Sequence, residues 1–191
     1  TNVTTLSLGT ERIGPSGGSG MLYIDEIRLY RVAPVSAQAV SLKNDFEAVA
    51  VGANMHDVDG WEGWWGDAQW AAKITDAVAY SGTNALEIVG TRDDLVPNWP
   101  LVDSGIYVAS VMQYVPASTD GLMHFGPLSS YGASWDDTAW LGTLLSNCST
   151  GFVYVNELDA GSRIETPLIR DQWVELRIVM NFDANTCDFY Y

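Results

Sequence analysis

The segment Trp173-Val174-Glu175-Leu176-Arg177-Ile178-Val179-Met180-Asn181-Phe182 decides the fold class of this chain. Its even-numbered positions are all apolar, whereas Glu175, Arg177 and Asn181 stand between them. Successive side chains of a β-strand point to opposite faces, so this period of two predicts a strand with one buried face.

Four further runs upstream are short and rich in β-branched and aromatic residues, which favour strands: 21–30, 85–89, 105–115 and 151–156. Clusters of turn-forming residues lie between or beside them, at 14–20, 81–84 and 183–186. Residues 68–80 are the best helical candidate, but their apolar positions fit a strand equally well. Because strands do not alternate with helices, we predict an all-β fold, an antiparallel β-sandwich.

Composition limits the classes of protein that this chain can represent. Its 191 residues suffice for one sandwich domain, or for one domain and a fragment. The formal net charge of −15 argues against a nucleic-acid partner, because such proteins need a basic face to neutralise phosphates. No run of 18 apolar residues occurs, so we expect no membrane span.

Charge also divides the chain into two parts. Residues 1–40 carry as many acids as bases, so the net charge of −15 lies on residues 41–191. A change this sharp supports a domain boundary, and the small residues and proline of 32–40 suit a linker. The alternative is a crossover between two strands of a single domain.

Tryptophan is concentrated in two stretches, 61–70 and 135–140, where it stands beside acids and glycine. Neighbouring strand residues face opposite ways, so one core cannot bury all of these indoles and some should be exposed. An exposed indole covers the apolar face of a sugar ring, while carboxylates accept hydroxyl protons. We therefore expect glycan binding at Trp61, Trp64, Trp65, Trp70, Trp135, Asp136 and Trp140. The alternative is that these rings pack in the core or cover sheet edges.

Asp25 shares a face of the expected strand 21–30 with Tyr23 and Ile27. A buried carboxylate is costly unless hydrogen-bond donors or a cation compensate its charge. One expectation is a structural Ca²⁺ bound by Asp25, with Glu47 as a further oxygen ligand. The other is that backbone amides donate hydrogen bonds to Asp25.

Cys148 and Cys187 are the only cysteines. An even cysteine count, little lysine and many tryptophans favour a secreted protein, in which these two residues are expected to form a disulfide.

Signals for catalysis are weak, so we expect no enzyme. His56 and His124 lie in different segments and are expected in loops or on the surface. The run Gly14-Pro15-Ser16-Gly17-Gly18 has the letters of a nucleophile elbow but leads into a strand instead of a helix, so we expect a hairpin turn. Glu157 and Asp159 resemble the start of the E-x-D-x-x-E strand of sandwich hydrolases, but position 162, where the third acid should stand, is Ser162.

Several stretches together resemble LamG-like or concanavalin A-like jelly-roll domains of large secreted bacterial proteins. Residues 17–31 resemble the closing strand of such a domain, and residues 171–183 with 186–191 resemble the paired strands near its end. Asp45-Phe46-Glu47 and residues 80–88 resemble the opening of carbohydrate-binding jelly rolls. The usual histidine after Trp173 is missing.

This resemblance implies a fragment of two tandem copies of a jelly roll. Residues 1–33 are then the closing strands of one copy, 34–44 a linker, and 45–191 a second copy without its last strands. Because those last strands should resemble residues 4–30, the N-terminal hairpin is expected to dock in their place.

The sequence thus predicts a non-catalytic carbohydrate-binding or adhesive module of a secreted or cell-surface protein, next to tandem neighbours. Two alternatives remain open. One is a structural spacer or protein-interaction domain in an adhesin-like array. The other is part of a glycoside hydrolase or lyase, which needs two acids about 5–10 Å apart in an open groove.

Overall fold

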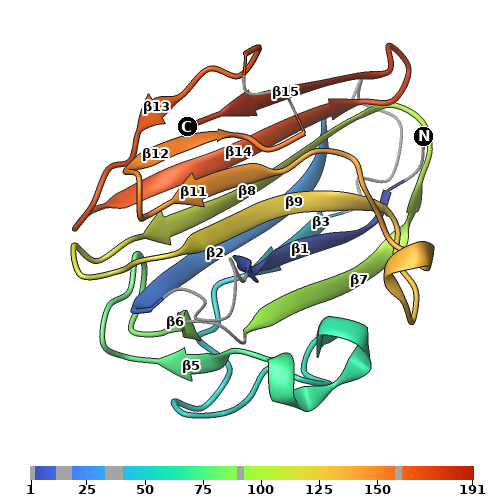
Figure 1. The fold of residues 1–191 in the computed structure, drawn as a ribbon. Helices are drawn as coiled ribbons and strands as arrows, with labels where there is room; N and C mark the ends of the chain where they lie inside the picture. The colour runs from blue at the N-terminus through green and yellow to red at the C-terminus, as the bar shows by residue number, and fades with distance from the viewer. Residues whose placement is uncertain (1–2, 12–18, 33–40, 90–92, 158–160) are drawn as a thin grey trace.

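The chain forms two antiparallel β-sheets that pack face to face, as the ribbon in Figure 1 shows. The computed structural model describes residues 3–11, 19–32, 41–89, 93–157 and 161–191. Asp159 lies outside these ranges, and of the turn expected at 14–20 only residues 19 and 20 lie within them. The all-β prediction is confirmed: the architecture is an antiparallel sandwich, consistent with a jelly roll.

The first sheet has eight strands, seven of them in the order β13-β12-β11-β9-β1-β7-β4, while β10 pairs with β9. Their bounds are β1 (Val3–Glu11), β4 (Trp61–Gly63), β7 (Asp94–Val102), β9 (Leu122–Ser130), β10 (Ala139–Trp140), β11 (Leu144–Asn147), β12 (Phe152–Val155) and β13 (Thr166–Pro167).

The second sheet has seven strands, six of them in the order β15-β14-β8-β2-β6-β5, while β3 pairs with β2. Their bounds are β2 (Met21–Val32), β3 (Ser41–Asn44), β5 (Lys73–Thr75), β6 (Ala85–Val89), β8 (Ile106–Tyr114), β14 (Trp173–Asn181) and β15 (Thr186–Tyr190). The segment that decides the fold class is β14, and its Leu176, Ile178 and Met180 are buried.

The two N-terminal strands are integral to the sandwich. β1 lies between β7 and β9, and β2 lies between β6 and β8. The expected docking of this segment on later strands is therefore observed, but not as a hairpin, because β1 and β2 belong to different sheets. Of the predicted linker, residues 41–44 form β3, and 34–40 lie outside the described ranges. The assignment of 1–33 to a separate jelly-roll copy stays a prediction.

Helical structure is confined to three short 3₁₀ turns in the described part of the chain: η1 (Trp64–Gly66), η2 (Ala68–Trp70) and η3 (Trp135–Asp137). The helical candidate 68–80 contains η2 and then β5, so the strand interpretation holds for its centre. There is no helix among the described residues that is long and apolar enough to cross a membrane.

The hydrophobic core lies between the sheets. Alternate residues of strands from both sheets fill it, among them Leu6, Leu8, Met123 and Phe125 from the first and Ile24, Leu29, Leu176 and Ile178 from the second. Full burial of one such side chain stabilises the fold by about 1.5–3 kcal/mol. Because these inward residues fix the parity of each strand, they also determine which side chains reach the outer face of the first sheet.

Candidate functional site

An aromatic cluster covers one end of the outer face of the first sheet. Trp64 is its centre, and it packs on Val96 of β7 and Leu128 of β9, which point away from the core between the sheets. We define the aromatic cluster as Trp64, Trp65, Tyr131, Trp135 and Trp140, which come from η1, the end of β9, η3 and β10. Figure 1 shows η1 and η3 side by side at this end of the molecule.

Trp64 is almost fully buried because other rings surround it. Its ring centroid lies 5.1 Å from that of Tyr131, 5.6 Å from that of Trp135 and 6.0 Å from that of Trp65. Trp140 stacks on it at 6.1 Å, with only 11° between the ring planes. Such ring pairs add about 0.5–1.5 kcal/mol each beyond their buried area, so these contacts stabilise the arrangement of the rings around Trp64.

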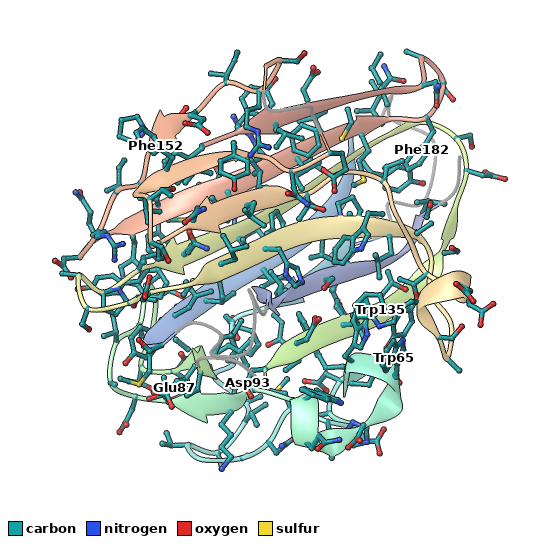
Figure 2. The ribbon with its side chains drawn as sticks, in the orientation of Figure 1. Trp65, Glu87, Asp93, Trp135, Phe152 and Phe182 are labelled. Carbon is teal, nitrogen blue, oxygen red and sulfur yellow. The ribbon has the colours of Figure 1, made fainter. Side chains whose placement is uncertain are left out.

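Trp65 and Trp135 form the exposed surface of this cluster. They are 37% and 64% exposed, whereas Trp64 is 4% exposed. Their ring centroids are 5.1 Å apart and their planes meet at 76°. Figure 2 shows the two side chains next to each other, between η1 and η3.

The backbone holds Trp65 in an uncommon conformation. Its φ of 57° lies in the left-handed region, which bulky residues rarely adopt. The hydroxyl of Tyr131 accepts a hydrogen bond of 2.5 Å from the backbone N–H of Trp65 and so fixes the turn. Burial raises the pKa of Tyr131 to about 12, and the charges of Glu62 and Asp94 contribute to this shift. The phenol therefore stays neutral at physiological pH.

Gly63 allows η1 and η2 to fold back on β4. A Cβ at this position would overlap the carbonyl oxygen of Asp67 and lie 2.9 Å from the backbone nitrogen of Ala71. The carboxylate of Asp67 in turn accepts a 3.0 Å hydrogen bond from the backbone N–H of Gln69 at the start of η2. Glycine and aspartate thus set the path that brings Trp64 and Trp65 onto the sheet.

The structure brings together most of the predicted glycan-facing residues, although they come from two distant stretches. Trp64, Trp65, Trp135 and Trp140 contact one another, Trp70 packs against the same cluster, and Asp136 is exposed beside Trp135. Trp61 is an exception and its assignment to a glycan-facing surface is wrong. It is 1% exposed and packs against Phe46 in the core, because β4 points it inward.

The sequence analysis missed Tyr131, which both fixes Trp65 and contacts Trp64. Its signal was weak because Tyr131 follows β9 in an irregular segment, where the strand period no longer assigns a face. One buried donor in the cluster also stands out: the Nε1–H of Trp64 has no acceptor within the described part of the chain. Buried polar groups normally have a partner.

A polar trio lies beside the cluster on the same outer face: Ser7 of β1, Asp94 of β7 and His124 of β9. Ser7 Oγ donates to Asp94 Oδ1 at 3.0 Å and lies 2.9 Å from His124 Nε2. His124 Nε2 is 3.7 Å from the same Asp94 oxygen, and its ring meets Trp140 edge to face. The prediction that His124 lies in a loop or on the surface is wrong, since it belongs to β9 and its side chain is 9% exposed.

Gly9 makes room for the trio. It pairs with Asp94 on one side and with His124 on the other, and a Cβ at Gly9 would lie 2.8 Å from the Asp94 carboxyl. The Asp94 side chain can therefore extend across β1 toward Ser7 and His124. A larger residue at position 9 would displace it.

The trio does not have the arrangement of a hydrolytic triad. In a triad, histidine Nε2 accepts the serine proton while the carboxylate binds the other ring nitrogen. Here Ser7 donates to Asp94, and the Asp94 carboxylate lies 3.7 Å from Nε2, the ring nitrogen that already faces Ser7. The carboxylate therefore approaches the same ring nitrogen as the serine, which differs from the geometry of a triad.

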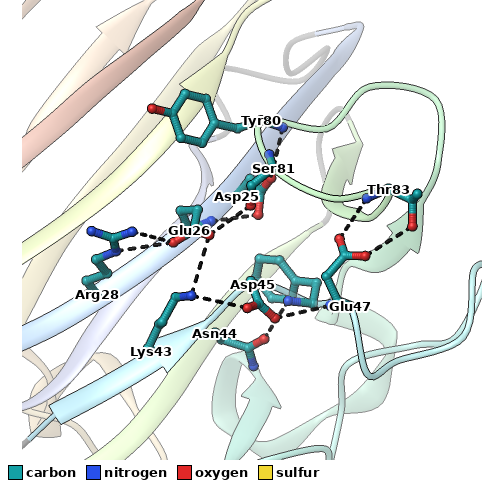
Figure 3. Close-up of polar contacts among 11 residues, drawn as sticks. Asp25, Glu26, Arg28, Lys43, Asn44, Asp45, Glu47, Tyr80, Ser81 and Thr83 are labelled. Carbon is teal, nitrogen blue, oxygen red and sulfur yellow. Dashed lines mark hydrogen bonds and ion pairs between the residues drawn. The ribbon is translucent and has the colours of Figure 1, made fainter.

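Asp25 is completely buried and accepts three hydrogen bonds from backbone amides. Oδ1 accepts from Glu26 at 2.7 Å, and Oδ2 accepts from Tyr80 and Ser81 at 2.9 and 3.0 Å (Figure 3). Burial raises the pKa of Asp25, while these amides oppose the shift. The contacts match the second expectation for this residue, in which amides rather than a cation compensate the carboxylate.

Glu47 anchors the same loop from its other end. Its Oε1 accepts hydrogen bonds from the backbone N–H groups of Thr83 and Asn84 at 3.0 and 2.7 Å, and Oε2 accepts from the Thr83 hydroxyl at 3.0 Å. These bonds, led by that from Asn84, lower the pKa of Glu47.

The oxygens of Asp25 and Glu47 therefore accept hydrogen bonds from N–H and O–H donors, while a role of these residues as Ca²⁺ ligands stays a prediction. Within the described ranges, no three His, Cys, Asp or Glu side chains are grouped so as to hold a metal ion. We assign both carboxylates to loop anchoring.

The expected disulfide is wrong, because Cys148 and Cys187 are free thiols. Cys148 follows β11 in the first sheet and Cys187 belongs to β15 in the second, and both pack against the apolar core. Burial raises the pKa of Cys148 to about 11 and that of Cys187 to about 12.

In comparisons with known proteins, no family model, curated protein or solved structure matches this chain. Function must therefore be inferred from the geometry of the site itself.

Proposed function

We propose that the aromatic cluster is a glycan-binding surface and that the chain is a non-catalytic carbohydrate-binding or adhesive module. The observation that carries this proposal is the pair of exposed, mutually perpendicular indoles of Trp65 and Trp135. The flat apolar face of a pyranose matches an indole in size and polarity, and exposed indoles otherwise cost free energy in water.

Rigidity supports this proposal. Side chains that are ordered before binding lose little conformational entropy when a ligand arrives. Trp64 supports both exposed rings, and the left-handed conformation of Trp65 costs about 1–2 kcal/mol that the rest of the fold must offset. Strained residues of this kind cluster at functional sites.

The polar trio favours binding over catalysis. The Asp94 carboxylate approaches the same ring nitrogen of His124 as Ser7 does, and not the other ring nitrogen as in a hydrolytic triad. A secreted or cell-surface location and tandem neighbouring domains belong to the same proposal and rest on the resemblance to LamG-like jelly rolls.

Tryptophan fluorescence tests the proposal. A panel of soluble polysaccharides should include at least one that quenches or shifts the emission of the wild-type protein, and Trp65→Ala and Trp135→Ala should each weaken its binding at least about tenfold. Phe152→Ala is the matched control, because Phe152 is also an exposed aromatic residue but lies on the opposite side of the view in Figure 2. Equal loss in all three variants, or no response to any glycan, would overturn the proposal.

A further inference from the structure

We infer that the ligand of the aromatic cluster is a glycan with protonated amino groups, such as a polymer of unacetylated glucosamine. The inference rests on the proposed glycan-binding function and names the class of sugar. It follows from how charge is distributed between the two sheets.

The first sheet has no lysine or arginine in any of its strands, nor do η1, η2 and η3. The strands and turns that carry the aromatic cluster and the polar trio do contain acids: Glu62, Asp94, Asp136 and Asp137, with Asp67 between η1 and η2. This end of the first sheet therefore presents negative charge next to exposed indoles.

Basic strand residues belong to the second sheet instead. Arg28 and Lys43 pair with Glu26 there, and Arg177 pairs with Glu175. Arg163 does contact the first sheet, but its guanidinium packs on the ring of Tyr154 in β12, and β12 and β4 lie toward opposite edges of that sheet. These described basic side chains therefore do not neutralise the acids around the cluster.

Several of these acids lie close to the exposed rings. Asp136 is exposed and adjoins Trp135 in η3, and Asp67 is exposed two residues after Trp65. Glu62 points to the same outer face, since its neighbour Trp61 points into the core. On the adjacent strand β7, Glu62 pairs with Val96, on which Trp64 packs. The negative charges of Glu62 and Asp94 both raise the pKa of Tyr131.

Indoles add to the attraction for a cation. An ammonium group within about 6 Å of an indole centroid is attracted by the negative face of the ring, and Trp is the strongest partner of this kind. The exposed indoles of Trp65 and Trp135, whose centroids are 5.1 Å apart, are therefore candidate partners for an ammonium group.

An amino sugar matches both features of this surface: its apolar ring face suits the exposed indoles, and its ammonium group suits the acids and the faces of the rings. An anionic glycan would meet repulsion within a Debye length of about 8 Å.

Calorimetric titration with matched oligosaccharides tests this inference. The probes are a glucosamine oligomer, its fully N-acetylated counterpart of equal length and an oligogalacturonate, each at mildly acidic pH in low and high salt. We expect the glucosamine oligomer to bind at least about tenfold more tightly than its acetylated counterpart in low salt, the difference to shrink in high salt, and the oligogalacturonate to bind most weakly.

Glu62→Gln should reduce the preference for the amine while it retains the weaker binding of the acetylated oligomer. Asp188→Asn, an exposed acid on β15 of the second sheet, is the control and should retain the preference. Equal binding of the two glucosamine-based oligomers would overturn the inference and leave the proposed function intact. Binding of none of the three probes, together with no response in the fluorescence panel, would overturn both.

Discussion

The indole of Trp135 stands at 76° to that of Trp65, although 70 positions separate the two residues in the chain. Neither ring lies in a regular strand: one belongs to η1 and the other to η3. Trp64, between them, contacts both. The exposed pair therefore depends on the buried ring of Trp64. Variants of Trp64 and Trp135 distinguish support of the fold from binding of a ligand.

Trp64→Ala should destabilise the protein by about 3–5 kcal/mol, because it removes a large buried ring and leaves a cavity under four aromatic neighbours. Trp135→Ala should cost about 1 kcal/mol or less, because that ring is 64% exposed. Urea denaturation followed by circular dichroism measures both changes. Similar losses in the two variants would mean that Trp135 supports the fold and does not serve as a binding surface.

Gly9→Ala should destabilise the protein by about 1–3 kcal/mol, because the new methyl group would lie 2.8 Å from the carboxyl of Asp94 and force it off Ser7. Gly161→Ala is the control, since a Cβ there meets nothing within 4 Å, and it should change stability by about 0.5 kcal/mol at most. Chemical denaturation compares the two. Unchanged stability of Gly9→Ala would show that the contact of Asp94 with Ser7 across β1 does not depend on a glycine at position 9.

Glu47 should make stability depend on pH in the acid range. Its folded pKa lies below the ordinary value of 4.5, so its contribution to stability is present above pH 4.5 and is lost as the pH falls through the folded pKa. Glu47→Gln keeps one acceptor oxygen but replaces the other by an amide group that cannot accept. The melting temperature should therefore fall, and its decline between about pH 5 and 3 should become shallower than in the wild type. Glu165→Gln, at an exposed site before β13, serves as the control, and an unchanged pH profile in Glu47→Gln would contradict the anchoring role.

Calcium separates the two interpretations of Asp25 and Glu47. If both carboxylates anchor the loop through N–H and O–H donors, added Ca²⁺ should leave the melting temperature of the wild type unchanged. A cation bound only by the folded state would raise it with concentration. A rise that Glu47→Gln abolishes would restore the calcium site that the sequence suggested.

Cys148 and Cys187 should react slowly with iodoacetamide in the native protein at neutral pH. The thiolate is the reactive form, and burial raises the pKa of the two thiols to about 11 and 12. Mass spectrometry should find both alkylated quickly once urea unfolds the chain without reductant. Protection that persists in urea until reductant is added would indicate a disulfide.

The fold could be predicted from sequence because burial on one face of a strand imposes a visible period. β14 shows this directly: Leu176, Ile178 and Met180 are buried, as the alternation predicts. Asp25 shows the limit of the same rule. The register between β2 and β8 shifts between Asp25 and Arg28, where Glu26 has a φ of 50°, so a bulge and not a regular strand sets the surroundings of Asp25.

The candidate site could be predicted in part. Composition pointed to the two tryptophan-rich stretches, but only tertiary contacts decide that Trp64 is covered and Trp65 is exposed, or that Trp61 belongs to the core. Tyr131 and the trio of Ser7, Asp94 and His124 involve residues from β1, β7 and β9 that meet through strand order. A single sequence carries no signal for that order, because it follows from long-range pairing.

The most direct test of a glycan surface at Trp65 and Trp135 is the set of indole N–H signals in ¹H–¹⁵N NMR spectra during titration with the glucosamine oligomer and its acetylated counterpart. Trp65→Phe and Trp135→Phe assign the two signals by their disappearance. We predict that these two signals shift most and saturate together, while those of Trp61 in the core and of Trp173 on β14 of the second sheet stay in place. Shifts confined to Trp173, or no shift of any indole with either oligomer, would contradict the account.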